Sequence, residues 1–342
     1  MKKHLTLLCA LALIGVVSAQ DDYTLVWNQD FTGTSLNKDA WNIEVNGEGG
    51  GNNELQYYCE KAVTLGVEPT TGKHCLILTA TKEDYKGKHC TSGRINSLGK
   101  TYFTYGKVEA RIKFPNTANG LWPAFWMMGN NYSQVGWPRC GETDIIELGN
   151  SNGYNGKQDR YFNGAMHVGR AWNAVWSDAQ ATTWYYSVED TFHIITCEWT
   201  PTSVKMYMDK DAHPEYGPYF QAKLEPNDDA DYNRQLVFGK PNFIIFNLAI
   251  GGNFPNIHDI NKVTALANGP RAMYVDWVRV YQRGETGETF QSTVQSDPIE
   301  ATPTGIIPAE LHPMPSKIIR DGRLYFLHQG RYYDVLGAPS AD

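Results

Sequence analysis

The sequence of 342 residues lacks any block of basic residues, and its formal net charge is -7. Nucleic acids and anionic membrane surfaces are bound by clustered lysines and arginines, so the charge distribution excludes both as main partners. After residue 20 no apolar run is long enough to form a transmembrane helix. The sequence also lacks a sustained helical period, an internal repeat and the cysteine spacing of a zinc site.

Cysteines are few, and one of the six lies in the apolar run near the N-terminus. An exported chain permits disulfide bonds, but the odd number that remains leaves at least one thiol free, and the sequence does not assign the pairs. The remaining cysteines are Cys59, Cys75, Cys90, Cys140 and Cys197.

The N-terminus has the composition of a secretory signal peptide. Two lysines precede a short apolar run, and Val17, Ser18 and Ala19 form a small-residue cleavage site. Cys9 lies inside the apolar run rather than just after it, so lipid anchoring is the weaker interpretation. We therefore expect residues 1–19 to be removed from a bacterial protein that is secreted, periplasmic or held at the cell surface.

Short alternating runs dominate the rest of the chain. In Lys107–Phe114 apolar residues alternate with charged ones, which predicts a strand with one core face and one solvent face. The sequence predicts an all-β sandwich of two stacked sheets, in which an outer face can curve into a groove. Turn-forming residues separate similar runs at Cys75–Thr81, Phe192–Trp199, Val204–Asp209, Phe243–Ile250 and Met273–Tyr281.

The composition changes after Gln282. Residues 284–316 are rich in Thr, Ser, Pro and Glu, which is typical of a linker. Residues 317–342 contain Asp-Gly and Gln-Gly between short apolar segments, as in a small hairpin or meander. We therefore predict a main domain over residues 20–283, then a linker and a small C-terminal tail.

Three acids in the stretch CGETDIIEL are separated by two and then by three positions. Glu142 and Asp144 share one face of a regular strand, whereas Glu147 would point to the other face. A bulge of one extra residue at Ile145 and Ile146 would return Glu147 to the first face and turn at least one isoleucine into the core. The spacing therefore predicts three carboxylates on one face.

Such a cluster suits glycoside hydrolysis. Clustered carboxylates repel one another, so at least one of them holds its proton more tightly. An ionised carboxylate can then attack the anomeric carbon while a protonated one donates to the leaving oxygen. Positions two pleats apart lie roughly 7 Å apart, so the side-chain tips can close to the about 5–5.5 Å of a retaining enzyme. A solvated strand face and a cation site are the alternatives.

Aromatic residues near the acids favour the sugar site. Aromatics make up 13% of the sequence, and flat rings suit the C–H faces of sugars. The run LWPAFWMM places Trp122 and Trp126 on one strand face, and Trp137 leads directly into the acids. For Trp122 a position in the core is the alternative, because interior tryptophans are common.

Together, the runs WPAFWMMG and WPRCGETDIIE resemble the active-site region of glycoside hydrolase family sixteen, the laminarinase and lichenase group, in its bulged E-x-D-x-x-E form. The similarity extends from WNQDFTGTSLNKDAW, near Leu25, to DWVRVYQ at Asp276–Gln282. The resemblance implies a curved β-jelly-roll sandwich, concanavalin-like, with an open cleft on its concave sheet. It also implies endo-hydrolysis of β-glucan with retention of configuration.

Carried over to this sequence, the resemblance assigns a role to each acid. Glu142 would be the nucleophile, and Glu147 the general acid and later the general base. Asp144 would lie between them and hydrogen-bond the nucleophile. Thr143 stands where the family often has Ile or Leu, a departure on the opposite face that leaves these roles unaffected.

The same resemblance implies further substrate-binding residues. In GNNELQYY, Asn53 is the first candidate and Asn52 the second for an asparagine that reaches the sugar. Arg94 in TSGRINS resembles an arginine that contacts sugar hydroxyls, and His167 in GAMHVG resembles a histidine beside the acids. A turn role for the asparagines and a structural role for the histidine are the alternatives.

Many family members hold a structural calcium through an acid near the start and an aspartate in the last strand. Here these would be Asp30 and Asp276, and Asp30 is one methylene shorter than the glutamate that relatives often have. No cofactor is expected for catalysis.

We therefore expect a monomeric, retaining endo-β-glucanase that acts on β-1,3-glucan, on mixed β-1,3/1,4-glucan or on both. An enzyme of the same fold that cuts agarose, porphyran or carrageenan is less favoured, because Arg94, Arg139 and scattered lysines are few for a sulfated substrate. A lectin-like glucan-binding module is the alternative from another class, since fold does not imply function. Such a module would not need an acid–base pair.

Overall fold

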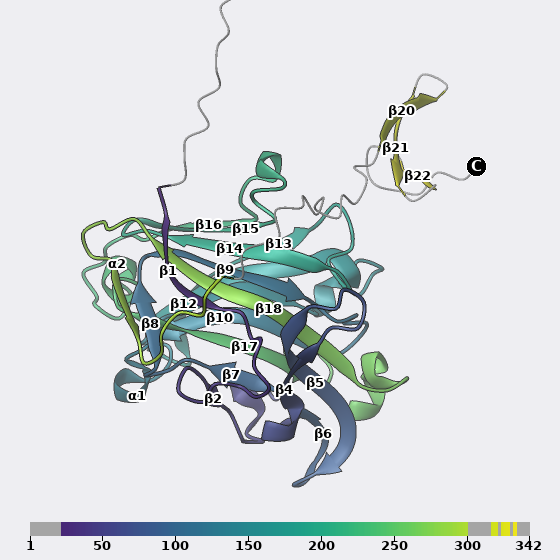
Figure 1. Cartoon of the computed structure of the whole chain (residues 1–342), viewed down its shortest axis with the longest axis horizontal. Coiled ribbons are helices and arrows are strands. Elements are labelled where there is room, and N and C mark those ends of the chain that lie inside the picture. Colours follow the sequence, from purple (N-terminus) through teal and green to yellow (C-terminus); the bar gives the residue numbers. More distant parts are fainter. Residues whose placement is uncertain (1–21, 300–315, 321–322, 329–330, 334–342) are drawn as a thin grey trace, which may run out of the picture.

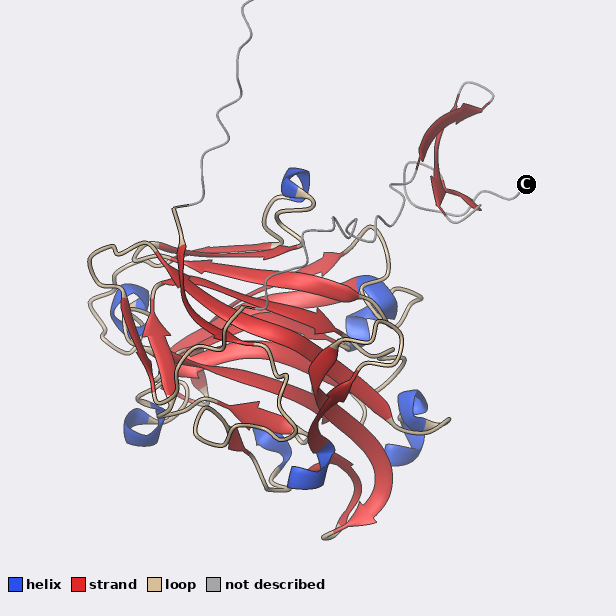
Figure 2. Ribbon diagram, in the orientation of Figure 1, coloured by secondary structure: helices blue, strands red, loops and turns tan. Residues whose placement is uncertain are grey.

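The computed structural model describes residues 22–299 in full and the backbone of three strands within residues 316–333, and these parts are mostly β-structure (Figures 1 and 2). Two large sheets of ten and nine strands make up the body. The predicted all-β fold is confirmed. Helical structure in residues 22–299 is limited to single turns: α1 (Tyr132–Val135), α2 (Arg234–Val237), η1 (Gly49–Gly51), η2 (Glu60–Ala62), η3 (Ser151–Gly153), η4 (Gln158–Arg160), η5 (Pro214–Tyr216), η6 (Ile260–Lys262) and η7 (Thr264–Leu266).

The ten-stranded sheet has the order β16-β15-β14-β9-β18-β5-β6-β3, with β1 paired to β18 and β4 paired to β5. Its strands are β1 (Thr24–Gln29), β3 (Tyr57–Tyr58), β4 (Val63–Val67), β5 (His74–Tyr85), β6 (Lys88–Ser92), β9 (Gly106–Lys113), β14 (Phe192–Trp199), β15 (Ser203–Met208), β16 (Phe220–Lys223) and β18 (Arg271–Gln282).

The nine-stranded sheet has the order β13-β12-β11-β10-β17-β7-β2, and β8 pairs with both β17 and β19. Its strands are β2 (Asn42–Ile43), β7 (Arg94–Asn96), β8 (Thr101–Thr104), β10 (Leu121–Gly129), β11 (Glu142–Leu148), β12 (Tyr161–Ala171), β13 (Ala174–Thr183), β17 (Asn242–Ile250) and β19 (Thr289–Ser292).

One apolar core fills the space between the two large sheets. Phe125 of β10 and Phe246 of β17 lie opposite each other in register, and their rings stack with centroids 4.8 Å apart. From the other sheet, Val108 and Ile112 of β9 are buried in the same cluster. The alternation in the sequence therefore correctly identified the core face of β9.

The outer face of β9 differs from the predicted solvent face. Lys107 and Glu109 are buried and form an ion pair of 3.4 Å, and Arg111 pairs with Asp276 of β18 at 2.7 Å. Lys107 Nζ also lies 4.6 Å from the ring centroid of Tyr281. The prediction of a wet face was wrong for Lys107 and Glu109, because their charges compensate each other and the ring of Tyr281 packs against Lys107, whereas Arg111 stays partly exposed.

The predicted start of the linker at residue 284 is also wrong. Strand β19 pairs with β8, and the side chain of Asp297 accepts a hydrogen bond of 3.0 Å from the backbone N–H of Asp30. Thr, Ser and Glu resemble a linker in composition, but here they belong to a strand with an exposed face. The folded body reaches at least Asp297. Residues 300–315 and the predicted signal peptide lie outside the described residues.

Near the C-terminus, three strands form a separate antiparallel sheet, as the predicted meander requires. They are β20 (Ser316–Arg320), β21 (Arg323–His328) and β22 (Arg331–Tyr333). In the part of the chain that the structure describes, no helix has the length and apolarity needed to span a membrane.

All cysteines within residues 22–299 are buried free thiols. Burial raises the pKa of Cys75, Cys90 and Cys140 to about 12, so these thiols stay protonated and unreactive. The disulfide bonds that an exported sequence permits are therefore absent from this part of the chain.

Candidate active site

A bulge in β11 brings the three acids to one face. Ile145 and Ile146 lie where β11 shifts register against β12, because Asp144 pairs with Ala165 whereas Glu147 pairs with Asn163. Two residues of β11 thus oppose one of β12, which is the predicted bulge. Both isoleucines are fully buried in the core.

The register with β10 shows that the acids share a face. Glu142, Asp144 and Glu147 pair with three alternate residues of β10, and alternate residues of a strand point the same way. We call the face of the nine-stranded sheet that carries these acids the site face. The three partners in β10 are Met128, Trp126 and Ala124.

Each acid has a specific hydrogen-bond partner. The indole N–H of Trp122 donates to Glu147 Oε1 at 2.9 Å, and Trp137 donates to the carboxylate of Glu142. Glu142 also hydrogen-bonds Asp144, whose Oδ2 lies 3.2 Å from Nε2 of His167. Asp144 and Glu147 are buried, whereas Glu142 is partly exposed. The cluster is therefore ordered by contacts on both sides and reaches solvent at Glu142.

Burial is the main cause of the altered proton affinities. Desolvation raises the pKa of Glu147 to about 7, against the hydrogen bond from Trp122. Desolvation and the charge of Asp144 raise the pKa of Glu142, and desolvation and the charge of Glu147 raise the pKa of Asp144 against its hydrogen bonds with His167 and Glu142. Glu142 and Asp144 titrate as a coupled pair. Burial alone would lower the pKa of His167, but the three neighbouring carboxylates raise it to about 9.

Burial and these shifts bear on the alternatives for the cluster. The burial of Asp144 and Glu147 contradicts a solvated strand face. Ligand atoms of Glu142, Asp144 and His167 do lie within 4.8 Å of one another, close enough for a metal ion. The raised pKa values mean that the carboxyl groups of Glu142 and Glu147 can hold and release protons near neutral pH, which acid catalysis requires.

Arg94 and Trp126 meet beside the acids, because Trp126, in the neighbouring strand β10, pairs with Asp144, and Arg94 reaches it from β7, three strands from β11. Arg94 of β7 pairs in register with Asn247 of β17, which pairs with Ala124 of β10. The guanidinium of Arg94 lies 4.8 Å from the ring centroid of Trp126, and the indole N–H of Trp126 donates to Asn247 Oδ1 at 2.7 Å. Glu44 accepts a hydrogen bond of 2.8 Å from Arg94 Nε, so the arginine is fixed and its charge is compensated.

Asn52 and Asn53 lie in a loop and hydrogen-bond to Asn253. Asn53 has a positive φ of 58°, and its side chain donates to Asn253 at 3.0 Å. The backbone N–H of Asn253 in turn donates to the carbonyl of Asn52 at 2.8 Å. These contacts include the turn role foreseen for an asparagine in a glycine-rich loop. Neither side chain contacts a catalytic candidate in the described residues.

Trp122 is buried, but on the site face rather than in the main core. Its ring stacks on Phe254 at 4.7 Å, and its N–H is directed to Glu147. Phe254 follows Asn253 in the chain, so one loop contacts both Asn53, through Asn253, and Trp122, through Phe254. Trp137 differs from both other tryptophans because it is 40% exposed, which leaves ring surface open beside Glu142.

Several residues of the site face were not identified from the sequence. Asn247 is a polar residue among the apolar site-face residues of β17, and this break in the pattern was a usable signal. Glu54 lies near Glu147 and accepts a hydrogen bond of 3.0 Å from Tyr58, and Asn163 lies opposite Glu147. Phe254 lies in a loop, so no hydrophobic periodicity in the sequence identifies it.

The proposed calcium ligands are each close to an arginine. Asp276 pairs with Arg111 at 2.7 Å, and Asp30 lies 3.6 Å from Arg279. Asp30 Oδ1 is buried without a hydrogen bond, and desolvation raises the pKa of this carboxyl group. A buried carboxylate oxygen without a hydrogen bond can serve as a calcium ligand, but the ion would compete with Arg279, which lies 3.6 Å from the same oxygen. Arg111 lies closer to Asp276, at 2.7 Å, so Asp30 is the better candidate of the two.

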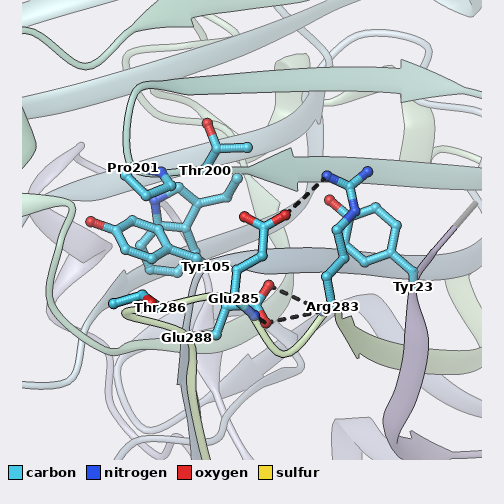
Figure 3. A pocket seen from close by; sticks show the side chains of 9 residues that line it. Tyr23, Tyr105, Thr200, Pro201, Arg283, Glu285, Thr286 and Glu288 are labelled. Atoms are coloured by element: carbon cyan, nitrogen blue, oxygen red, sulfur yellow. Dashed lines mark hydrogen bonds and ion pairs between the residues drawn. The ribbon is translucent and has the colours of Figure 1, made fainter.

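A small pocket elsewhere on the body lacks the cluster of proton-holding acids found on the site face (Figure 3). Tyr105 lies on one side of the pocket, and Arg283 lies opposite with Glu285 and Tyr23 beside it (Figure 3). Trp199 also lines the pocket and contacts the ring of Tyr105 edge to face at 5.2 Å. The carboxylate of Glu288 accepts hydrogen bonds from the backbone N–H groups of residues 283–285. The acids of this pocket therefore hold a turn together.

Comparison with known proteins points to one family. Residues 20–224 match the family model described as Glycosyl hydrolases family 16. The chain is 33% identical over 302 residues to the clotting factor G alpha subunit of Tachypleus tridentatus, and the match covers 84% of this chain and 39% of that protein. It is 30% identical over 264 residues to a beta-glucanase of Rhodothermus marinus, covering 76% and 85% respectively.

A solved structure supports the same relationship. The mixed-linkage glucan GH16 structure from Bacteroides ovatus, in complex with a G4G4G3G product, is 35% identical and superimposes with a TM-score of 0.65. The match covers 75% of this chain and 100% of that one. The jelly-roll sandwich predicted from the sequence is confirmed by this similarity together with the two stacked sheets.

The raised pKa of His167 leads to a testable dependence of stability on pH. The folded state binds the proton of His167 more tightly than the unfolded chain, so the stability that it contributes is complete below about 6.5 and is lost as the pH rises to about 9. His167→Gln should therefore flatten the fall in melting temperature between pH 7 and pH 9. The control is His89→Gln, because the side chain of His89 is 73% exposed. Identical pH profiles for wild type and His167→Gln would contradict this account.

Proposed function

Because the chain belongs to glycosyl hydrolases family 16, we propose that it is a secreted, retaining endo-β-glucanase that hydrolyses β-1,3-glucan, mixed-linkage β-1,3/1,4-glucan or both. The observation that carries the proposal is the arrangement of Glu142 and Glu147 on one face of β11, with Asp144 between them. The tyrosine and tryptophan content and the absence of basic blocks agree with a neutral polysaccharide as the partner.

The proposed reaction is a double displacement. The carboxylate of Glu142 attacks the anomeric carbon while Glu147 gives its proton to the glycosidic oxygen, so the leaving sugar departs as an alcohol. Glu147, now ionised, takes a proton from a water molecule that attacks the anomeric carbon of the glycosyl-enzyme. The second step frees Glu142, restores the proton on Glu147 and retains the configuration.

The raised pKa of Glu147 suits this residue to the role of general acid. With a pKa raised to about 7, Glu147 holds a proton in a large fraction of molecules at neutral pH and can release it during the reaction. Desolvation and the hydrogen bond with Asp144 favour a proton on Glu142, so this proton has to move to Asp144 or to solvent before Glu142 can attack. The positive charge of His167 beside the pair stabilises the remaining negative charge.

A neutral glucan is favoured over a sulfated galactan. Arg94 is paired with Glu44 and His167 is engaged with Asp144, so both cations of the site face are already compensated. A sulfate group is bound best by cations that are free to face it. The β-glucanase of Rhodothermus marinus and the mixed-linkage product in the Bacteroides ovatus structure also support a glucan.

The lectin-like alternative is not favoured by the geometry. A binding module needs rings and hydrogen-bonding groups, but it has no use for two buried acids with raised pKa values, since burying carboxyl groups is costly. Buried, proton-holding acids beside a partly exposed one are typical of a catalytic centre. Binding of glucan without turnover would restore the lectin-like function.

Replacing Glu142 tests the proposed activity. Glu142→Gln removes the nucleophile while preserving shape, so it should reduce sugar release from laminarin and from barley-type glucan by roughly 10³-fold or more. The control is Glu60→Gln, an exposed residue paired with Lys38, which should release sugar at the wild-type rate. Undiminished release by Glu142→Gln would refute the assignment. The product lengths from mixed-linkage glucan would report which linkage the site accepts.

Calcium binding at Asp30 is a second proposal, carried by the unsatisfied buried Oδ1 of this residue. A ligand that binds only the folded state stabilises it, by about 2.7 kcal/mol at a concentration 100 times its dissociation constant. Millimolar calcium should therefore raise the melting temperature of the chelator-treated protein, and Asp30→Asn should reduce this effect. Equal melting temperatures with calcium and with chelator would contradict the proposal.

A further inference from the structure

Three aromatic rings form a stack on the surface outside the site face. Tyr185 follows the end of β13, whereas His213 and Tyr216 lie in the connection between β15 and β16 that contains η5. The rings of Tyr185 and Tyr216 are 4.8 Å apart with an interplanar angle of 28°, and those of Tyr216 and His213 are 4.9 Å apart at 23°. Tyr216 is therefore covered on both faces, and Tyr185 is one end of the stack.

The outer face of Tyr185 is open to solvent. One face of its ring is covered by Tyr216, yet the residue as a whole remains 69% exposed. The turn that carries Tyr216 projects beyond β15 and β16, as Figure 2 shows. A single exposed ring is common on protein surfaces, so a binding site here depends on how firmly this ring is held by its neighbours.

Trp184 anchors the stack of Tyr185 and Tyr216 to the core. Trp184 precedes Tyr185, is only 5% exposed, and lies in T-shaped contact with Tyr216 at 5.2 Å. Its ring also lies 5.7 Å from that of Phe162 in the main core, and its backbone N–H donates to the carbonyl of Arg160 at 2.7 Å. The stack is thus preorganised, and a ligand that binds it loses little free energy to ordering side chains.

We propose that the open face of Tyr185 is a second binding site for the glucan chain, separate from the catalytic acids. The flat ring can stack on the C–H face of one glucose unit, whose hydroxyl groups then stay in solvent at the ring edge. This inference rests on the glucan specificity proposed above.

The site lies too far from the acids to be part of the same short ligand. Glu147 pairs with Asn163 of β12, Asn163 pairs with Ala181 of β13, and Tyr185 lies four residues farther along the chain. Two strand spacings sideways and four residues lengthwise place Tyr185 roughly 15 Å from Glu147 at the backbone. A polymer can therefore span both sites, whereas a disaccharide bound at the acids cannot.

Binding at both sites would raise the local concentration of the polymer at the acids. Loss of the Tyr185 ring should therefore weaken binding and turnover of long chains while leaving a short substrate unaffected. This difference separates a second binding site from a general effect on the catalytic acids.

Affinity electrophoresis through gels that contain laminarin or mixed-linkage glucan measures the binding directly. In the Glu142→Gln background, Tyr185→Ala should weaken apparent binding at least about threefold, whereas Tyr185→Phe, which keeps the ring, should stay within about twofold. In the active enzyme, Tyr185→Ala should lower kcat/KM on the polymer by a similar factor and leave kcat/KM on an activated disaccharide unchanged. Melting temperatures verify that both variants fold.

Two results would overturn the proposal. The first is equal retardation of the Tyr185→Ala and Tyr185→Phe proteins by both glucans. The second is a concentration-dependent dimer in sedimentation that Tyr185→Ala abolishes, because the ring would then pack on a second copy of the chain. Glucan binding that depends on Tyr185 without any sugar release would sustain the second site and reject the proposed hydrolysis, so the two failures are distinguishable.

Discussion

The bulge at Ile145 and Ile146 is the constraint on which the rest of the site depends. A regular strand would send Glu147 into the apolar core, where Ile145 and Ile146 now lie. The extra residue costs backbone hydrogen bonds in the ladder, but burial of two isoleucines offsets this loss. The same sheet that packs against the core on one side can therefore present three carboxyl groups on the other.

Placing three acids together is unfavourable unless their charge is reduced. The structure reduces it in two ways, since desolvation favours the protonated carboxyl groups and His167 contributes a positive charge beside Asp144. The hydrogen bonds from Trp122 and Trp137 act in the opposite direction and stabilise ionised forms of Glu147 and Glu142. Burial and these two indoles thus oppose each other, which leaves the acids able to exchange protons near neutral pH.

The sequence predicted the features that repeat along the chain and missed those made by distant segments. Alternation identified the strands, and the interval between Glu142 and Glu147 identified the bulge, because both depend on local geometry. The burial of Lys107 depends on Tyr281, and the place of Asp297 depends on Asp30, so neither could be read from a local pattern. The partners of Trp122 and Trp126, in Phe254 and Asn247, come from segments more than a hundred residues away and carry no periodic signal across that separation.

Rescue by azide tests most directly that Glu142 and Glu147 act on one anomeric carbon from one sheet face. With an activated β-glucan oligosaccharide, Glu142→Ala plus azide should yield an α-glycosyl azide, because azide then replaces the nucleophile in a single displacement. Glu147→Ala plus azide should yield the β-glycosyl azide, because azide then attacks the covalent intermediate held by Glu142. The same anomer from both variants, or no rescue of either, would contradict the account.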